Sequence, residues 1–478
     1  MLKELKAEFN KTVTENGDKA YKSTESGLLD FFSSAGAMRA SSDQDVLKKF
    51  VFAWDEDPTL ALKALFYFRD IRGGQGERRL FRTILNYLGD NHADRLKPLV
   101  KLIPEYGRWD DLLVLLNTKV EDEVVAAIEE QLREDVESEK PSLLAKWLPS
   151  ENTSSKTTKL HAKYLIKKLG LNSRVYRKTL SKLRATINVL ERTMSAKEWK
   201  AIEYDKIPSK AGMRYRTAFF RNDQERYEAF LQSVEKGEKK INSGTLYPYE
   251  IYNQVTRSSA NDRTLDEMWK ALPNYVKEGE NALVMADVSG SMHGDPMAVS
   301  VSLALYFAER NKGPFANHFM TFSGEPDLVE IKGSNIYEKM SFIQRSHWEM
   351  NTNIERAFNT ILKTAVEANV GQEDLPKRLY IISDMQFDGR GWGATVSGRD
   401  KSSFERARAA FASHGYALPE IVFWNVRDTD NKPVTKNDVG VQLVSGLSPT
   451  LFKQITSGLS ATDLMLEILN GERYEPIK

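Results

Sequence analysis

The chain has 478 residues, of which 41% are hydrophobic and 28% charged, and a formal net charge of +1. This length exceeds what one hydrophobic core usually supports, so we expect at least two domains. The small net charge gives no sign of a nucleic-acid or membrane partner, so such a sign must come from local charge clusters. The absence of cysteine excludes disulfides, thiolate metal sites and a cysteine nucleophile.

The N-terminal sequence and the hydropathy pattern both indicate an intracellular protein. The opening segment, MLKELKAEFNKTV, is too charged for a signal peptide. No stretch approaches the ~18 uninterrupted apolar residues of a membrane-spanning helix. We therefore expect a cytoplasmic protein with no membrane partner.

The first half of the chain has the spacing of amphipathic helices. Residues 1–43 read as an irregular lead-in with one short helix near Leu28–Phe32. From about residue 44, apolar residues recur at i, i+3 and i+4, with predicted helical faces at 46–54, 60–68, 80–88 and 96–103. Short consecutive helices are typical of HEAT or armadillo repeats. No strict consensus recurs, so an irregular helical bundle is the alternative. Residues 237–248 are the expected linker, with a helix at 265–272 after it.

After residue 280 short apolar strands alternate with helices. Strands are predicted at 283–286, 318–322, 379–383, 420–426 and 441–444, and helices at 296–310, 354–369, 404–414 and 449–455. Apolar strands that alternate with helices are typical of a parallel sheet covered on both faces. We therefore predict an α + α/β protein, with a helical-repeat domain at 1–275 and a doubly wound α/β domain at 276–478. Two separate cores imply that residues 280–478 fold alone.

Three polar loops follow the strands or precede the helices of the predicted sheet. The first contains Asp287, Ser289 and Ser291, which alternate along the chain and should point the same way. The second spans 349–353, and the third is Ser383-Asp384. Ligands of such sheets bind at the carboxyl ends of the strands, and a cluster of carboxylate and hydroxyl oxygens suits Mg²⁺, with Mn²⁺ or Ca²⁺ as alternatives. The competing interpretation is an ordinary strand-to-helix turn capped by serine.

This arrangement resembles the metal-ion-dependent adhesion site (MIDAS) of von Willebrand A (vWA) and integrin I domains. By this resemblance hydroxyls bind the ion directly and carboxylates hold its waters: Ser289, Ser291 and Thr352 in the first role, Asp287 and Asp384 in the second. The resemblance also implies an open position that a partner's carboxylate fills. Asn351 and Ser346 compete with Thr352, because this loop lacks the glycine-rich approach common in the family.

Charge in the helical half is unevenly distributed. Residues 121–139 contain nine acidic residues and one base, whereas residues 152–190 contain ten lysines or arginines and no acid. Basic side chains at helical spacing, continued by others among aromatic residues, form a candidate RNA-binding face: Lys156, Lys159, Lys163, Lys167, Arg174, Arg177, Lys178, Arg184, Arg214, Arg216 and Arg221. Such faces attract phosphates, and aromatic rings stack bases. The alternatives are a solvated helix face or one neutralised by the acidic block.

A helical-repeat region followed by a vWA-like domain resembles the TROVE proteins, which include the Ro autoantigen. A closer resemblance is to a family of phage, bacterial and plant proteins of unassigned function with TROVE-like and vWA regions. It rests on motifs spread along the chain: residues 14–17 (TENG), 68–78 (FRDIRGGQGER), 106–111 (YGRWDD), 146–150 (KWLPS) and 382–388 (ISDMQFD). In the second motif, glycines flanked by arginines suit a phosphate, but they follow a helix, which favours a loop between helical repeats.

The Ro resemblance implies a function without catalysis. Ro proteins are rings of helical repeats, closed by the vWA domain, that bind single-stranded RNA ends and small structured RNAs. By this resemblance the chain is an RNA-binding scaffold of a ribonucleoprotein, for which a monomer suffices. The alternative is a metal-dependent protein-interaction or assembly factor without RNA. An enzyme is disfavoured, because a catalytic metal site usually has more carboxylates or a nearby base.

Overall fold

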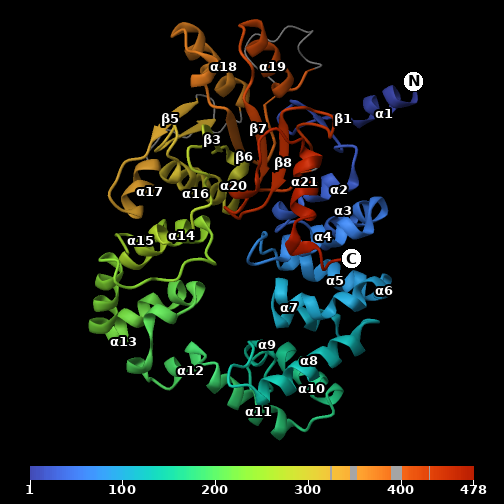
Figure 1. The fold of residues 1–478 in the computed structure, drawn as a ribbon, viewed down its shortest axis with the longest axis vertical. Coiled ribbons are helices and arrows are strands. Elements are labelled where there is room, and N and C mark those ends of the chain that lie inside the picture. Colours follow the sequence, from blue (N-terminus) through green and yellow to red (C-terminus); the bar gives the residue numbers. More distant parts are fainter. Residues whose placement is uncertain (323–325, 345–352, 389–400, 430) are drawn as a thin grey trace. The chain divides into compact units, whose positions relative to one another are not determined.

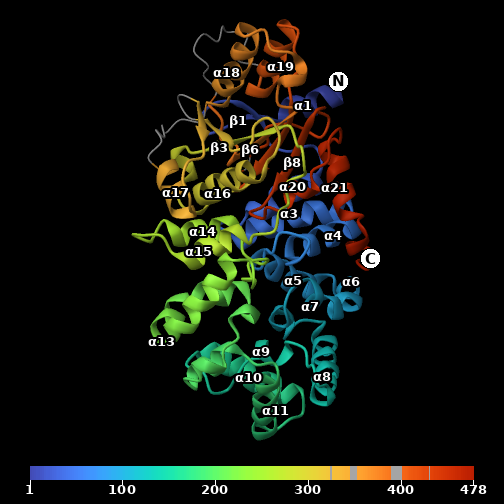
Figure 2. The ribbon, with the colours of Figure 1, turned by 60° about the vertical axis from the view of Figure 1, so that its left-hand side comes forward.

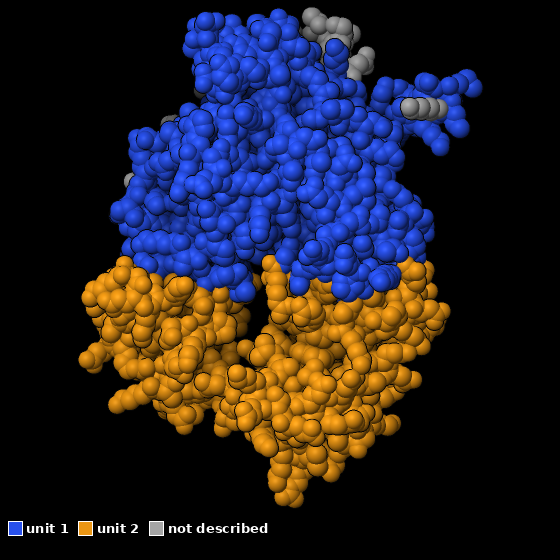
Figure 3. All heavy atoms as spheres, viewed as in Figure 1, with its two compact units in different colours: residues 1–68, 73–75, 243–478 blue, residues 69–72, 76–242 orange. Residues whose placement is uncertain are grey.

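The computed structural model describes residues 1–478 except 323–325, 345–352, 389–400 and 430. The chain forms two compact units (Figure 3), one of residues 1–68, 73–75 and 243–478 and the other of residues 69–72 and 76–242. This division differs from the predicted boundary at residue 275, because the first 68 residues share a core with the sheet. In the described part of the chain, no helix is long and apolar enough to cross a membrane.

The first unit is built on a six-stranded sheet. Its strands are β3 (Ala282–Asp287), β4 (His318–Phe322), β5 (Asp327–Glu330), β6 (Arg378–Ser383), β7 (Glu420–Asn425) and β8 (Val441–Ser445). They lie in the order β5-β4-β3-β6-β7-β8, and all neighbours are parallel except the antiparallel pair β4–β5. The strand order reverses between β3 and β6. Ligands of open α/β sheets bind at such a switch point, outside the carboxyl ends of the strands.

The same unit contains the helices that follow residue 242, some on the sheet and others, such as α14 and α15, on neighbouring helices (Figures 1 and 2). They are α14 (Pro248–Val255), α15 (Arg263–Lys270), α16 (Asp295–Arg310), α17 (Ile336–Gln344), α18 (Ile354–Glu367), α19 (Ser403–Ser413), α20 (Leu451–Gln454) and α21 (Ala461–Leu469). The apolar helix α16 lies across β3, β4 and β6, and α21 packs along β8. The predicted parallel α/β architecture is thereby confirmed. The sequence prediction omitted β5, because this edge strand has only four residues, three of them exposed, and lacks the apolar run of a buried strand.

The N-terminal segment is an ordered part of the same unit. It contains α1 (Leu2–Asn10), the hairpin β1 (Lys11–Val13) and β2 (Lys19–Tyr21), α2 (Gly27–Phe32), α3 (Asp43–Glu56) and α4 (Pro58–Arg69). Gly36 lies against β8, where its amide donates to the Ser445 hydroxyl at 3.1 Å. A Cβ at Gly36 would lie 2.5 Å from the Ser445 carbonyl oxygen, so only glycine allows this approach. The expected irregular lead-in is therefore wrong beyond its one predicted helix.

The second unit consists of helices and turns. Its helices are α5 (Arg79–Asn91), α6 (Ala93–Leu96), α7 (Ile103–Tyr106), α8 (Glu121–Glu137), α9 (Leu144–Trp147), α10 (Lys156–Lys168), α11 (Ser173–Thr186), α12 (Leu190–Ser195) and α13 (Ser209–Glu235). Helical packing thus agrees with the predicted class of this region. A break in α13 at Asp223 (φ −151°, ψ 47°) divides it into two helical parts.

Two of the sequence motifs named above, residues 68–78 and 106–111, meet in a buried ion-pair network of the second unit. Arg69 and Asp111 are both buried and form an ion pair at 2.7 Å. Arg82 bonds to the other Asp111 oxygen at 2.6 Å, and Arg108 and Arg82 share Asp110. These arginines pair with the carboxylates, because a charge buried without a partner is costly. The motif residues Arg69 and Asp111 have a structural role inside the helical unit.

Candidate metal centre

The first side of the candidate centre is the turn that follows β3. Asp287 ends this strand with its side chain fully buried, and its Oδ1 accepts a hydrogen bond of 2.9 Å from the Ser289 amide. Residues 290–292 then form a short 3-10 turn. This turn brings the Ser289 and Ser291 hydroxyl oxygens within 3.2 Å of each other. The predicted alternation thus places these three side chains together.

The second side is the end of β6, the strand next to β3. The Ser383 hydroxyl donates to Oδ2 of Asp287 and accepts from the Met385 amide at 3.0 Å. Asp384 is almost fully buried, and its Oδ1 accepts from the Gln386 amide at 3.1 Å. Four of the five predicted metal-site residues therefore lie together at the β3–β6 switch point.

The electrostatics of the centre favour a cation. Burial raises the pKa of Asp287 to about 7, and the neighbouring Asp384 adds to the rise, against hydrogen bonds from Ser289 and Ser383. Burial likewise raises the pKa of Asp384, although Ser291 and Arg427 oppose this. Among the described residues no lysine, arginine or histidine forms a salt bridge with either carboxylate. Two buried carboxylates without a salt-bridge partner are costly when ionised, and a divalent cation would lower that cost.

The donor set fits a hard divalent cation. It offers carboxylate and hydroxyl oxygens only, which are the ligands that Mg²⁺, Mn²⁺ and Ca²⁺ prefer. Thr352 and its competitors Asn351 and Ser346 lie outside the described residues. Within the described ranges, no group of three or more histidine, cysteine, aspartate or glutamate side chains is arranged for a metal. A metal at this centre would therefore need the serine hydroxyls as ligands beside the two carboxylates.

The sequence prediction missed residues on two other segments that support the centre. The Thr429 hydroxyl donates to the Asp384 carbonyl at 3.0 Å, and Arg427 donates to the Ser291 carbonyl. The turn of the N-terminal hairpin lies along residues 386–388, and the negative charge of Glu15 contributes to the raised pKa of Asp384. Nothing in the spacing of these residues links them, because some 370 residues separate the hairpin from β6.

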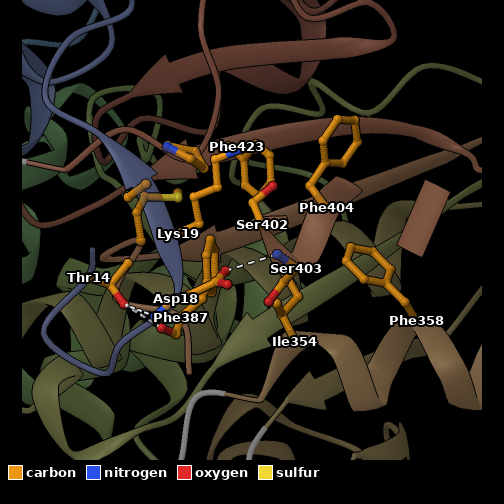
Figure 4. Close-up of a pocket in the computed structure, with 13 residues that line it drawn as sticks. Thr14, Asp18, Lys19, Ile354, Phe358, Phe387, Ser402, Ser403, Phe404 and Phe423 are labelled. Carbon is orange, nitrogen blue, oxygen red and sulfur yellow. Dashed lines mark hydrogen bonds between the residues drawn. The ribbon is translucent and has the colours of Figure 1, made fainter. Parts of the chain in front are cut away.

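A small apolar pocket lies between this hairpin and the helices near the centre (Figure 4). Phe358, Phe404 and Phe423 line it, and the Asp18 carboxylate at its edge accepts from the Ser403 amide at 3.1 Å. The cavity volume of about 10 Å³ admits about one water molecule. The cavity therefore lies where the hairpin meets α18 and α19, and it is too small for an organic ligand.

The basic face of α10 and α11 is largely exposed. Every predicted lysine and arginine of these two helices is exposed apart from Arg184. The acidic helix α8 pairs with Lys168, Lys97 and Lys101. In the fully described segment 76–242, no salt bridge involves Lys156, Lys159, Lys163 or Lys167. The acidic block therefore leaves these four charges unneutralised.

Other members of the predicted RNA-binding face are used inside the unit. The Arg184 guanidinium donates to the carbonyls of Ala145 and Leu148 and to the Ser150 hydroxyl, at 2.8 to 2.9 Å. Phe219 is fully buried, with its ring 5.3 Å from that of Tyr204. Buried rings cannot stack on bases, so the predicted aromatic contribution is reduced. The exposed charges of α10 and α11 remain.

Comparison with known proteins gives two family matches and one close relative. Residues 14–143 and 143–284 match the family described as Domain of unknown function (DUF2828). Residues 281–465 match Domain of unknown function (DUF7788). The chain is also 32% identical over 514 residues to an uncharacterized protein of Acanthamoeba polyphaga mimivirus, covering 98% of this chain and 89% of the relative. The junction of the two matches lies near the predicted change from helices to strands.

Proposed function

We propose that this member of the DUF2828 family, which continues into a DUF7788 domain, is a non-catalytic binding protein with a metal-dependent adhesion site. In this proposal the sheet domain is of the vWA type and holds Mg²⁺, or Mn²⁺ or Ca²⁺ in its place. Asp287, Ser289, Ser291 and Asp384 hold the ion together with Thr352. A protein partner supplies a carboxylate to the open coordination position.

The observation that carries the proposal is the meeting of donors from two strands at the sheet's switch point. Ser383 of β6 bonds to Asp287 of β3, and the buried Asp384 follows Ser383 directly. The strand order that creates this point has the 3-2-1-4-5-6 pattern of ligand-binding doubly wound sheets, apart from the antiparallel edge strand. A serine cap explains neither the buried pair of carboxylates nor its position.

Thermal unfolding with and without divalent ions tests the proposal. Wild-type protein should melt at a higher temperature in excess Mg²⁺ or Mn²⁺ than in EDTA, because an ion that binds only the folded state stabilises it by about 2.7 kcal/mol at 100 times its Kd. Asp287→Asn keeps the side-chain shape and should abolish the shift. Asp374→Asn, at an exposed acid of the same unit, should retain it. A wild-type protein that no divalent ion stabilises would contradict the proposal.

The second candidate function is RNA binding on the helical unit. In this proposal the unit is HEAT-like and the chain is a TROVE-type ribonucleoprotein scaffold that binds single-stranded RNA ends or small structured RNAs. The observation in its favour is the exposure of Lys156, Lys159, Lys163 and Lys167 beside an acidic helix that pairs with other lysines. Binding of a single-stranded RNA at two salt concentrations distinguishes it from a purely protein-binding function.

A further inference from the structure

Three of the sequence motifs named above each contribute a cationic side chain to one group in the second unit. Arg78 ends the first of these motifs, Arg108 lies in the YGRWDD motif and Lys146 begins the KWLPS motif. The 3-10 turn Trp109–Leu115 packs against both α5 and α9. This turn therefore joins the helices that carry or follow the other two cations.

Arg108 and Lys146 are both positioned by the Trp147 ring. The Nε and Nη2 atoms of Arg108 donate to the Asp110 carboxylate at 2.9 and 2.8 Å. The guanidinium carbon of Arg108 lies 3.9 Å from the centre of the Trp147 ring, a cation–π contact. The Lys146 ammonium lies 5.7 Å from the same ring centre. Two cations from different segments are therefore held around one half-buried indole.

Arg78 joins this group through α5. It precedes the helix directly, and its carbonyl accepts from the Arg82 amide one turn later at 3.1 Å. Arg82 and Arg108 share the Asp110 carboxylate, at 2.7 and 2.8 Å. Partial burial and repulsion from Arg108 and Arg82 lower the pKa of Arg78, in agreement with this proximity. The exposed guanidinium of Arg78 thus lies beside the other cations.

The turn that carries Lys146 and Trp147 is itself fixed. The Arg184 guanidinium donates to the carbonyls of Ala145 and Leu148, at 2.8 and 2.9 Å, and these two residues flank the pair. A ligand of this surface therefore meets side chains that the fold has already ordered, which lowers the entropy lost on binding.

The carboxylates of the network do not neutralise it. Three arginines share two carboxylates: Arg69, Arg82 and Arg108 with Asp110 and Asp111. Within the described part of the chain, the side chains of Arg78 and Lys146 form no hydrogen bond or salt bridge. Five cations thus face two carboxylates, and three positive charges have no acidic partner.

We propose that Arg78, Arg108 and Lys146 form a binding site for a phosphate group. Guanidinium and ammonium groups bind phosphate by charge-assisted hydrogen bonds, and the planar fork of arginine matches the phosphate oxygens. A phosphate monoester has close to two negative charges at pH 7 and would balance most of the excess. Its source is a phosphorylated small molecule or the terminal phosphate of an RNA. The site depends neither on the metal centre nor on the exposed lysines of α10.

Calorimetric titration of the full-length protein with pyrophosphate tests this inference. EDTA and low salt are used, so that pyrophosphate does not bind through a divalent cation. Arg78→Gln combined with Lys146→Gln should weaken binding at least about ten-fold, because hydrogen bonds to charged groups are lost. The melting temperature should stay close to that of wild type, since neither side chain has a salt bridge within the described chain.

The matched control is Lys119→Gln combined with Arg192→Gln, which removes two exposed cations of the same unit. Its net charge equals that of the first variant, and it should bind pyrophosphate as wild type does. Wild-type protein that does not bind pyrophosphate would overturn the inference. Equal weakening in the two double variants would overturn it as well, because binding would then follow net charge alone.

Two further ligands identify the source of the phosphate. A wild-type preference for RNA with a 5′ phosphate over the same RNA with a 5′ hydroxyl, lost in the Arg78 and Lys146 variant, assigns the site to RNA ends. Binding of AMP without that preference assigns it to phosphorylated small molecules. Changing Lys163, Lys167 and Arg177 to glutamate should leave pyrophosphate binding intact, so the failure of RNA binding on α10 and α11 is distinguishable from the failure of this site.

Discussion

Asp287 is a fully buried carboxylate next to a second buried carboxylate, so its ionisation opposes folding in the absence of a cation. Its pKa is about 7 in the folded protein and about 3.8 in the unfolded chain. Between these values the folded state holds a proton that the unfolded state has released. The free energy of unfolding of the metal-free protein should therefore fall as the pH rises from about 4 to about 7.

This dependence predicts that Asp287→Asn in EDTA becomes more stable than wild type as the pH rises. At pH 8 the variant should be more stable than wild type by up to about 4 kcal/mol, since the pKa of Asp287 rises from 3.8 to about 7 and each unit corresponds to about 1.4 kcal/mol. Near pH 4 the difference should vanish, because Asp287 is protonated in the folded wild-type protein. Melting temperatures across this pH range measure the effect, with Asp374→Asn as a control that should follow wild type. A difference between Asp287→Asn and wild type that is independent of pH would contradict it.

At the scale of elements, α10 and α11 present positive charges that the helical unit does not use. Lys163 and Lys167 lie one turn apart on α10, and the exposed Arg177 of α11 forms only a long ion pair with Glu151 at 3.9 Å and a hydrogen bond to the Ser173 carbonyl at 3.2 Å. Arg184 on the same helix is instead bonded to three groups of its own unit. The two kinds of basic residue have similar spacing in the sequence and differ only in the surface that each faces.

Charge reversal on these helices should weaken RNA binding in a salt-dependent manner. The logarithm of affinity for single-stranded RNA should fall with log salt by roughly 0.7 per phosphate contact, so about five contacts give a slope near −3.5. Changing Lys163, Lys167 and Arg177 to glutamate should flatten the slope and lower affinity for all sequences about equally. The matched control changes the exposed Lys236, Lys239 and Lys240 to glutamate and should have a much smaller effect. Equal RNA affinity of wild type and the α10–α11 variant would leave this face without a role in RNA binding.

At the scale of the whole molecule, the sheet unit is assembled from both ends of the chain. The amide of Tyr21 donates to the Lys432 carbonyl at 2.9 Å, and the Ser445 hydroxyl donates to the Phe32 carbonyl at 2.8 Å. Lys49 and Asp428 form a mostly buried ion pair. These contacts reverse the expectation that residues 280–478 fold alone, because that fragment would expose the surface that the first 68 residues cover.

We therefore predict that residues 280–478 alone are aggregated or melt without cooperativity. A chain lacking only residues 76–242, with Gln75 joined to Ser243 by about ten Gly and Ser residues, should be soluble and melt cooperatively. The joint is feasible because the Tyr247 hydroxyl bonds to the Gln75 carbonyl at 2.7 Å and such a linker spans roughly 17 Å. Calorimetry or circular dichroism of the two proteins measures the difference. A soluble, cooperatively melting 280–478 fragment would contradict this prediction.

The sequence by itself determined the local elements and the pattern of the candidate metal site. Runs such as 283–286 and 379–383 predicted buried parallel strands, because a strand covered on both faces must be apolar along its whole length. The alternation of Asp287, Ser289 and Ser291 depends only on neighbours in the chain, and it also held. Thr352 lies outside the described residues, so its place in the site stays a prediction.

Only the tertiary structure decided what distant segments do together. The hairpin that carries Glu15 contacts residues 386–388 through hydrogen bonds that no local pattern encodes, because spacing along a chain carries no information on pairs some 370 residues apart. The same holds for Arg184 and Phe219, whose helical spacing resembles that of exposed residues although packing places them inside. Periodicity specifies which residues share a face of a helix, but the neighbours that the fold brings to that face decide whether it is buried, paired or free.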